Sequence, residues 1–335
     1  MEAEPEIDDA SLRIARRGIS FTVGEDVCAA WHYLGSNASS WAGHGRPCVV
    51  MAHGLSGTRD GGLDGFAEGF ARAGLDVLVF DYRHFGASSG APRQLASAAR
   101  QLEDYRAAIR TARALDRIDA NRIVLWGFSF SAGHVLRLAC EDRRVAALVA
   151  LAPAWDGFAQ SLSVLRRDGP VQLARLSRLA IRDIAAAIKR RPPVTIPVSG
   201  QPGDIAMLTA PGAYVSMKAL GGLAWQNEVC ARFLMEVMAY RPARRAAGLN
   251  RPMLVQIADA DLNSPPRAAI TVAKRARAEV RHYPCDHFDV FTVPRWHQAA
   301  VDHQIGFMRR WLVTAATSGG RGTGGLDGGL TSASA

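Results

Sequence analysis

The sequence predicts an α/β fold with a mostly parallel central sheet, helices on both faces of the sheet and a helical cap insertion. Short β-branched runs alternate with longer helical patterns from Val49 to Ala152, as in βαβ units. The strand pattern is then lost over residues 155–250 and returns at Pro252. The 335 residues allow one large domain or two ordinary ones, and 48% hydrophobic with 21% charged residues is typical of folded proteins.

The position of each element follows from its local pattern. An antiparallel hairpin, residues 18–23 and 28–33, is expected at one edge of the sheet. Apolar, β-branched runs predict the remaining strands at 47–51, 76–80, 122–126, 146–151, 252–258 and 278–283. Helical periodicity predicts helices at 62–73, 94–114, 131–141, 266–276 and 297–312.

These elements divide the chain into four parts. Residues 1–17 form an N-terminal extension, and residues 18–154 together with 251–314 form the α/β core. Residues 155–250 form a helical cap inserted into the core. Residues 315–335 are rich in glycine and are expected to be a flexible tail.

The net charge of +9, from 40 basic and 31 acidic residues, is concentrated in the insertion. Residues 156–245 carry 13 Lys and Arg against 6 Asp and Glu, a surplus of seven. Such a patch could steer anions or contact acidic lipid headgroups, but solvated helix faces have the same composition. Because no nucleic-acid motif accompanies the charge, we expect no nucleic-acid partner.

The cysteine pattern and the apolar runs indicate a cytoplasmic protein. The five cysteines are widely spaced and include no CxxC pair, which argues against a disulfide framework or a thiolate zinc site. The N-terminus carries neither a secretory signal nor a transit peptide. The longest apolar runs are about half the roughly 20 residues that a membrane-spanning helix needs, so we expect no integral membrane span.

Ser129 lies where a strand leads directly into a helix. The predicted strand 122–126 continues as Gly-Phe-Ser-Phe-Ser-Ala-Gly (127–133). A serine on so sharp a turn has strained dihedral angles, and the residues two before and two after it must be small. Gly127 and Ser131 meet that need, although Ser131 departs from a strict G-x-S-x-G. The pattern predicts a nucleophile elbow with Ser129 as the nucleophile.

A serine hydroxyl is a weak nucleophile, so it needs a base and an acid that orients the base. On this kind of sheet the acid follows the serine and precedes the histidine in the chain. After strand 252–258 the sequence is Asp-Ala-Asp-Leu-Asn-Ser-Pro (259–265). We favour Asp261, because the turn before the proline can aim its carboxylate back into the site. Asp259 and Asp156 are the alternatives.

His287 is the predicted base. It lies in the loop Pro-Cys-Asp-His-Phe (284–288), four residues beyond Tyr283, where a side chain can reach the carboxyl edge of the sheet. Four other histidines are set aside because they fall within predicted strands or helices: His134, His282, His297 and His303.

An oxyanion hole is predicted from two backbone amides. Met-Ala-His-Gly-Leu (51–55) follows the first parallel strand, and its glycine allows the next amide to point into the pocket. We assign the hole to the N–H groups of Leu55 and Phe130, the latter being the residue after the nucleophile. His53 is interpreted as a hydrogen-bonded framework residue rather than a second base.

Four separated stretches carry a resemblance to a known family. Residues 53–60, 79–83, 125–135 and 283–289 resemble the α/β-hydrolase superfamily. Within it they are similar to bacterial serine hydrolases that are dienelactone-hydrolase-like, X-Pro-peptidase-like or polyketide-transferase-like, and the likeness spans residues 18–314.

Two positions depart from the pattern of these relatives. The common Arg-Gly-Phe-Gly turn is Arg83-His84-Phe85-Gly86 here, and Ser131 replaces a glycine. We expect His84 to reshape the neighbouring loop. A serine nucleophile in place of aspartate argues against dehalogenase or epoxide-hydrolase chemistry, and in place of cysteine against the dienelactone hydrolases themselves.

These observations predict a serine hydrolase that cleaves a small carboxylic ester through an acyl-enzyme, without metal or organic cofactor. Trp155, Met207 and Trp225 of the insertion are predicted to bind the substrate. The alternatives are a thioesterase or acyltransferase acting on an acyl substrate in a biosynthetic pathway, then a peptidase or a non-catalytic binding protein. The sequence leaves open a homo-oligomer.

Overall fold

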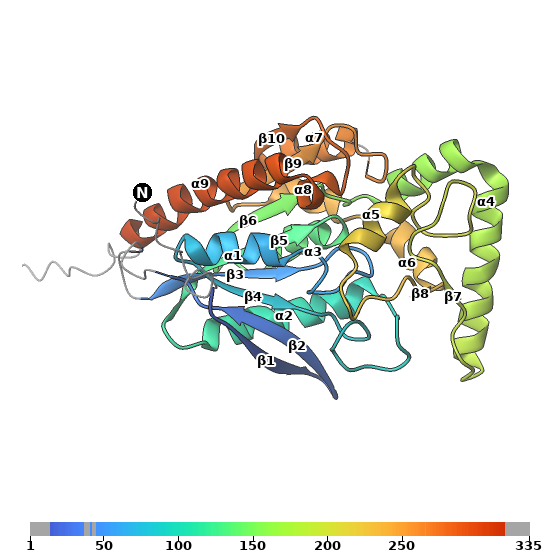
Figure 1. Ribbon diagram of the computed structural model, residues 1–335, viewed down its shortest axis with the longest axis horizontal. Coiled ribbons are helices and arrows are strands. Elements are labelled where there is room, and N and C mark those ends of the chain that lie inside the picture. The colour runs from blue at the N-terminus through green and yellow to red at the C-terminus, as the bar shows by residue number, and fades with distance from the viewer. Residues whose placement is uncertain (1–13, 37–40, 42–44, 265, 319–335) are drawn as a thin grey trace, which may run out of the picture.

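An eight-stranded sheet forms the centre of the molecule, a computed structural model that describes residues 14–36, 41, 45–264 and 266–318 (Figure 1). The strand order is β1-β2-β4-β3-β5-β6-β9-β10. The strands are β1 (Arg16–Val23), β2 (Asp26–Tyr33), β3 (Arg46–Ala52), β4 (Asp76–Phe80), β5 (Ile118–Phe128), β6 (Val145–Leu151), β9 (Met253–Ala258) and β10 (Glu279–Tyr283). β2 pairs antiparallel with β1 and β4, and all other neighbours are parallel. The predicted α/β fold with a mostly parallel sheet is confirmed.

Helices cover both faces of the sheet, which explains why β4 and β9 are buried along their whole length. On one face α1 (Asp64–Arg72) packs against α9 (Pro294–Ser318). On the opposite face α2 (Ala98–Ala114) packs against α3 (Phe130–Glu141) (Figure 1). α7 (Pro266–Ala276) and the short α8 (Asp289–Thr292) complete the core. The helix predicted at 266–276 has those bounds, whereas the last helix is longer than predicted.

Trp126 of β5 anchors a buried polar network between the sheet and α9. Its indole nitrogen donates to Gln304 Oε1 at 2.8 Å, and the Gln304 amide in turn donates to Gln256 of β9. On the other face, the Tyr105 hydroxyl of α2 lies 2.7 Å from the carbonyl oxygens of both Val50 and Trp126, which share its one proton. Because these groups are all buried, each pairing avoids the cost of an unsatisfied polar atom.

The cap segment, residues 155–250, lies beyond the carboxyl ends of the parallel strands (Figure 1). It contains α4 (Gly157–Ile188), α5 (Ala213–Leu220), α6 (Phe233–Ala239) and the 3-10 helix η3 (Pro242–Gly248). α4 kinks at Gly169, where φ is 80° and the next residue is a proline. The expectation that this segment has no strands is wrong. β7 (Thr195–Ile196) and β8 (Val229–Cys230) form a two-stranded antiparallel sheet, too short to leave a sequence signature.

The turn after β4 contains His84, the residue that we expect to reshape the neighbouring loop. It has a positive φ of 73°, a conformation that a glycine would adopt without strain. Its amide donates to the Ser89 carbonyl at 2.7 Å, and its ring nitrogen Nδ1 lies 3.0 Å from the Pro92 carbonyl oxygen. The histidine ring therefore ties down the loop that follows.

Two terminal predictions fall largely outside the described residues. These are residues 1–13 of the predicted extension and residues 319–335 of the predicted tail. Within the part of the chain that the structure describes, no helix is both long and apolar enough to cross a membrane.

Candidate active site

Ser129 lies at the tip of a strained turn between β5 and α3. Its φ of 53° and ψ of −115° are outside the regions that side-chain-bearing residues normally occupy. Three backbone hydrogen bonds hold this conformation. The Ser129 amide donates to Leu151 at 2.9 Å, and the Ser129 carbonyl accepts from Ala154 at 2.9 Å and from Ala132 at 3.2 Å. The structure thus places Ser129 on the predicted elbow.

Gly127 and Ser131 allow the strand and the helix to meet at this turn. A Cβ on Gly127 would lie 2.6 Å from the Ser131 carbonyl carbon, closer than real Cβ contacts. The Ser131 hydroxyl is turned away from the elbow tip. It accepts from the Phe128 amide at 3.0 Å and donates to the Ala52 carbonyl at 3.0 Å. The serine that replaces glycine here links β3 to β5.

His287 lies between Ser129 and Asp261. Its Nε2 is 3.1 Å from Ser129 Oγ, and its Nδ1 is 2.5 Å from Asp261 Oδ2. The imidazole is 2% exposed, and its ring packs against the rings of Phe128 and Phe288 at centroid distances of 4.8 and 4.7 Å. Because Asp261 can accept only from an Nδ1–H, Nε2 is left to accept the serine proton.

Of the three candidate acids, the structure brings only Asp261 to His287. Its other oxygen accepts from the amides of Asn263 and Ser264 at 2.8 and 2.6 Å, which fixes the carboxylate. Asp259 is about half exposed and pairs with His282. Asp156 caps α4 and pairs with Arg241 at 2.9 Å.

Two other histidines near the site, His53 and His134, are buried and form hydrogen bonds with neighbouring groups. His53 Nδ1 donates to the Gly54 carbonyl at 2.9 Å, and burial lowers the pKa of this imidazole. His134, in α3, contacts the Tyr240 hydroxyl at 2.7 Å and Gln101 Oε1 at 2.9 Å. Burial lowers the pKa of His134 to about 3, so its ring is neutral at pH 7.

Leu55 and Phe130, the two residues predicted to supply the oxyanion amides, both line the mixed cavity that contains Ser129. Phe130 is the first residue of α3, and a helix N-terminus carries free N–H groups and a partial positive charge. Leu55 belongs to the loop after β3 and lines both cavities that contain Ser129. Neither amide donates a hydrogen bond to another residue in the described part of the chain. Their role in an oxyanion hole stays a prediction.

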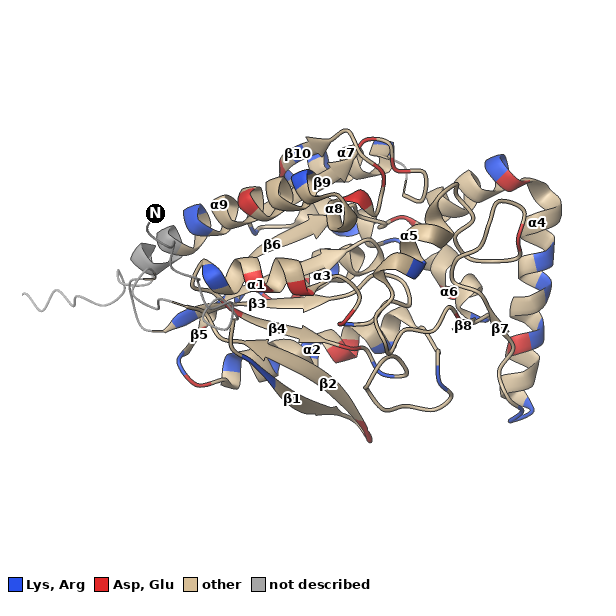
Figure 2. Ribbon diagram, in the orientation of Figure 1, with Lys and Arg blue, Asp and Glu red and all other residues tan. Residues whose placement is uncertain are grey.

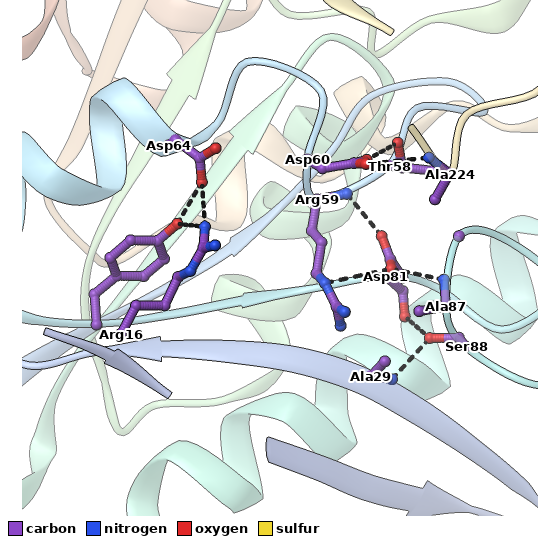
Figure 3. Close-up of polar contacts among 12 residues, drawn as sticks. Arg16, Ala29, Thr58, Arg59, Asp60, Asp64, Asp81, Ala87, Ser88 and Ala224 are labelled. Carbon is purple, nitrogen blue, oxygen red and sulfur yellow. Dashed lines mark hydrogen bonds and ion pairs between the residues drawn. The ribbon is translucent and has the colours of Figure 1, made fainter. Parts of the chain in front are cut away.

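The β3 loop (residues 53–60) is held by a buried carboxylate, that of Asp81. Asp81 accepts from the Arg59 amide at 2.6 Å and from the Ala87 amide at 3.1 Å, and its carbonyl accepts from the Ser88 hydroxyl at 2.7 Å (Figure 3). Desolvated carboxylates accept strong hydrogen bonds from backbone amides. Asp81 thus holds the end of the loop that carries Leu55 to the turn after β4.

The same loop also contacts the cap segment. Asp60 accepts from the Thr58 hydroxyl at 2.5 Å and from the Ala224 amide, beyond α5, at 3.1 Å (Figure 3). A side chain on Gly222 would collide with the Asp60 carboxylate, so only a glycine allows this approach. Core and cap are therefore joined beside the site.

Two cavities meet at Ser129, and Leu55, Leu208 and His287 line both of them. The apolar cavity has an empty volume of about 540 Å³, including space open to solvent. Its side-chain walls are mainly Phe128, Met217, Leu220, Trp225, Phe288 and Phe291. The mixed cavity is larger, at about 980 Å³, and adds polar side chains to an apolar wall. These polar residues are Gln160, Ser161, Ser163, Arg167, Ser177 and Asn263.

The three predicted substrate-binding residues lie in three different environments. Trp225 lines the apolar cavity and Met207 the mixed cavity, whereas Trp155 lines neither. Trp155 is 1% exposed and packs within the hydrophobic core, so its assignment to the pocket is not supported. A tryptophan at the start of an insertion can face either way, and the sequence does not distinguish the two.

Asn263 was missed by the sequence reasoning although it lies two residues after Asp261. Its amide oxygen and nitrogen are both buried, and neither has a hydrogen-bond partner among the described residues. Because it lines the mixed cavity, a bound molecule can satisfy this amide. The sequence signal that could have identified Asn263 was the presence of a polar side chain two residues after the predicted acid.

Within the described residues, no group of three or more His, Cys, Asp or Glu is arranged to hold a metal ion.

Comparison with known proteins agrees with the fold. A family model described as alpha/beta hydrolase fold matches residues 47–186. The quorum-quenching protein AidA of Acinetobacter baumannii is 37% identical over 295 residues, covering 87% of this chain and 94% of AidA. The thiohydrolase aneE of Aspergillus aculeatus is 32% identical over 157 residues, 47% of this chain and 49% of that protein.

A solved structure is similar over nearly its whole length. The crystal structure of the alpha/beta hydrolase GrgF from Penicillium sp. sh18 superposes with a TM-score of 0.75 at 22% identity. The match covers 89% of this chain and 99% of GrgF. Identity at this level supports the fold alone.

Ser129 is expected to be the reactive serine of the chain. A fluorophosphonate probe should label the wild-type protein and Ser131→Ala but not Ser129→Ala, because only the Ser129 hydroxyl contacts His287. Peptide mapping by mass spectrometry identifies the labelled residue. Labelling of Ser131, or equal loss in both variants, would rule out this assignment.

Proposed function

Since the chain belongs to the α/β-hydrolase superfamily, as its similarity to AidA and the matching family model establish, we propose that it is a serine hydrolase of carboxylic esters. The observation that carries the proposal is the pair of contacts made by His287, to Ser129 Oγ at 3.1 Å and to Asp261 Oδ2 at 2.5 Å. A serine, an imidazole and a buried carboxylate in this order are the parts that acyl transfer requires.

The reaction proceeds in two halves. Ser129 Oγ attacks the ester carbonyl while His287 Nε2 takes its proton, and the protonated imidazole then returns the proton to the departing alcohol. Water next attacks the acyl-enzyme while His287 takes its proton, and the imidazolium then returns that proton to Ser129 Oγ as the bond to the acyl group breaks and the carboxylic acid leaves. Asp261 keeps the proton on Nδ1 and stabilises the charged imidazolium throughout.

The tetrahedral oxyanion is stabilised by the amides of Leu55 and Phe130. Donors that are already in place when charge develops lower the barrier without further reorganisation. The α3 dipole acts in the same direction at Phe130. Asp81 contributes indirectly, because it positions the loop that carries Leu55.

The two cavities accommodate the two sides of the ester. An apolar group fits among the aromatic side chains of the apolar cavity, and the mixed cavity accepts a longer group with a polar function near Asn263. An unpaired buried amide favours a substrate that hydrogen-bonds to it over one that does not.

Cleavage of a thioester, or transfer of the acyl group to another acceptor, is the second candidate function. It is favoured by relatives named as thiohydrolases and as polyketide transferases, each similar over about half of this chain. A panel of p-nitrophenyl esters from acetate to palmitate, run beside an acyl-CoA and with alternative acceptors, separates these outcomes. Turnover of esters without transfer supports the hydrolase. Acyl-CoA cleavage alone would assign the chain to thioesterases.

Asp261→Asn should lower kcat for ester hydrolysis by about 10⁴-fold while leaving the protein folded, because the imidazole is then held in the wrong tautomer. Asp259→Asn is the matched control and should have only a mild effect, since Asp259 pairs with His282 at the surface. Steady-state kinetics, with circular dichroism as the folding check, measures both. A greater loss in Asp259→Asn would overturn the choice of acid.

Trp225→Ala and Met207→Ala should each shift the chain-length preference in kcat/KM, by roughly 1 to 3 kcal/mol at the affected wall. Trp155→Ala is the control, because that indole lies in the core and lines neither cavity. It should lower stability but keep the wild-type profile. If both cavity variants keep that profile, the substrate binds elsewhere.

A further inference from the structure

The second half of α4 exposes a row of aliphatic side chains at the edge of the molecule. Ile181, Ile184 and Ile188 are 61%, 38% and 79% exposed. At about 100° per residue they fall within roughly 60° of one another around the helix. An isolated apolar residue on a surface is ordinary, but a continuous row on a helix indicates a contact surface.

A row of basic side chains runs beside the aliphatic row. Arg175, Arg178, Arg182 and Lys189 are all exposed and also fall within roughly 60° of one another. Within the described residues, none of the four forms an ion pair. Figure 2 shows basic residues recurring along α4, at the edge of the molecule farthest from α9.

No acidic side chain in this half of the helix offsets that charge. Its one acidic residue, Asp183, is buried on the inner side and accepts from Arg232 at 2.7 and 2.9 Å. Asp183 also accepts from the Val194 amide at 2.9 Å, so it is fully engaged within the cap segment. The outer face therefore offers only cations and aliphatic groups.

We propose that this outer face of α4 docks on an anionic lipid bilayer. The isoleucines enter the boundary between headgroups and acyl chains, and the arginines bind lipid phosphates. A helix with an aliphatic row beside an uncompensated basic row has the chemistry of helices that lie in a membrane interface. Each basic residue near an anionic leaflet adds to the attraction.

The charge pattern disfavours a second copy of the chain as the occupant. A symmetric contact would bring the same arginines face to face, and like charges in contact repel.

The docking does not depend on the proposed ester hydrolysis. The inner side of the same helix, however, lines the mixed cavity through Leu173, Leu176 and Ser177. A docked protein therefore holds that cavity close to the lipid.

Vesicle sedimentation of the full-length chain tests the docking. Wild type should bind phosphatidylcholine vesicles that contain phosphatidylglycerol, bind those without it much more weakly, and release at high salt. Arg175→Glu/Arg178→Glu/Arg182→Glu should reduce the affinity by about 100-fold or more. Ile181→Ser/Ile188→Ser should reduce it by about tenfold or more, because inserted apolar area is lost.

The matched control is Arg110→Glu/Arg267→Glu/Arg309→Glu, which makes the same charge change at exposed positions on α2, α7 and α9. It should bind within about threefold of wild type, with circular dichroism confirming that every variant is folded. Failure of wild type to bind anionic vesicles, or equal loss in the control, would overturn the proposal. Binding to soluble polyglutamate but not to vesicles, lost in the first triple variant, would instead assign the face to an acidic protein.

Discussion

The strained backbone of Ser129 is the constraint on which the rest of the site depends. A serine with φ of 53° and ψ of −115° persists only where the surroundings over-determine it. Here the Ser129 amide and carbonyl are bound to the ends of neighbouring segments, at Leu151 and Ala154. Gly127 allows β5 and α3 to approach each other closely. Ser131, which stands where relatives have a glycine, adds hydrogen bonds from its hydroxyl to Phe128 and Ala52. Ser129, the proposed nucleophile, thereby lies at the N-terminus of α3.

The parallel sheet brings the other groups to that point. β5, β9 and β10 end at the same edge, so Ser129, Asp261 and His287 meet although more than 150 residues separate the first from the last. Asp81 and Asp60 extend the arrangement outward. One holds the β3 loop to the turn after β4, and the other ties that loop to the cap segment. The β3 loop, which carries Leu55, is therefore bound both to the core and to the cap segment.

The sheet, the elbow and the histidine loop could be predicted because each has a local pattern at a strand end. Choosing Asp261 over Asp259 relied on turn chemistry, and the structure supplies the reason. Asp261 is buried against His287, whereas Asp259 is about half exposed and pairs with His282. The walls of the two cavities could not be predicted in the same way. Trp155 faces the core, and Asn263 matters only because the fold leaves its amide unpaired. The two-residue strands β7 and β8 depend on long-range pairing and leave no periodic signal.

The most direct test of this account is to isolate the acyl-enzyme. The wild-type protein would be mixed with p-nitrophenyl acetate, quenched in acid within the first turnover and examined by intact-mass and peptide-mapping mass spectrometry. The account predicts a burst of p-nitrophenol and one acetyl group on the tryptic peptide that contains Ser129, with no such adduct in Ser129→Ala. Steady turnover without a covalent adduct, or an adduct on another residue, would contradict it.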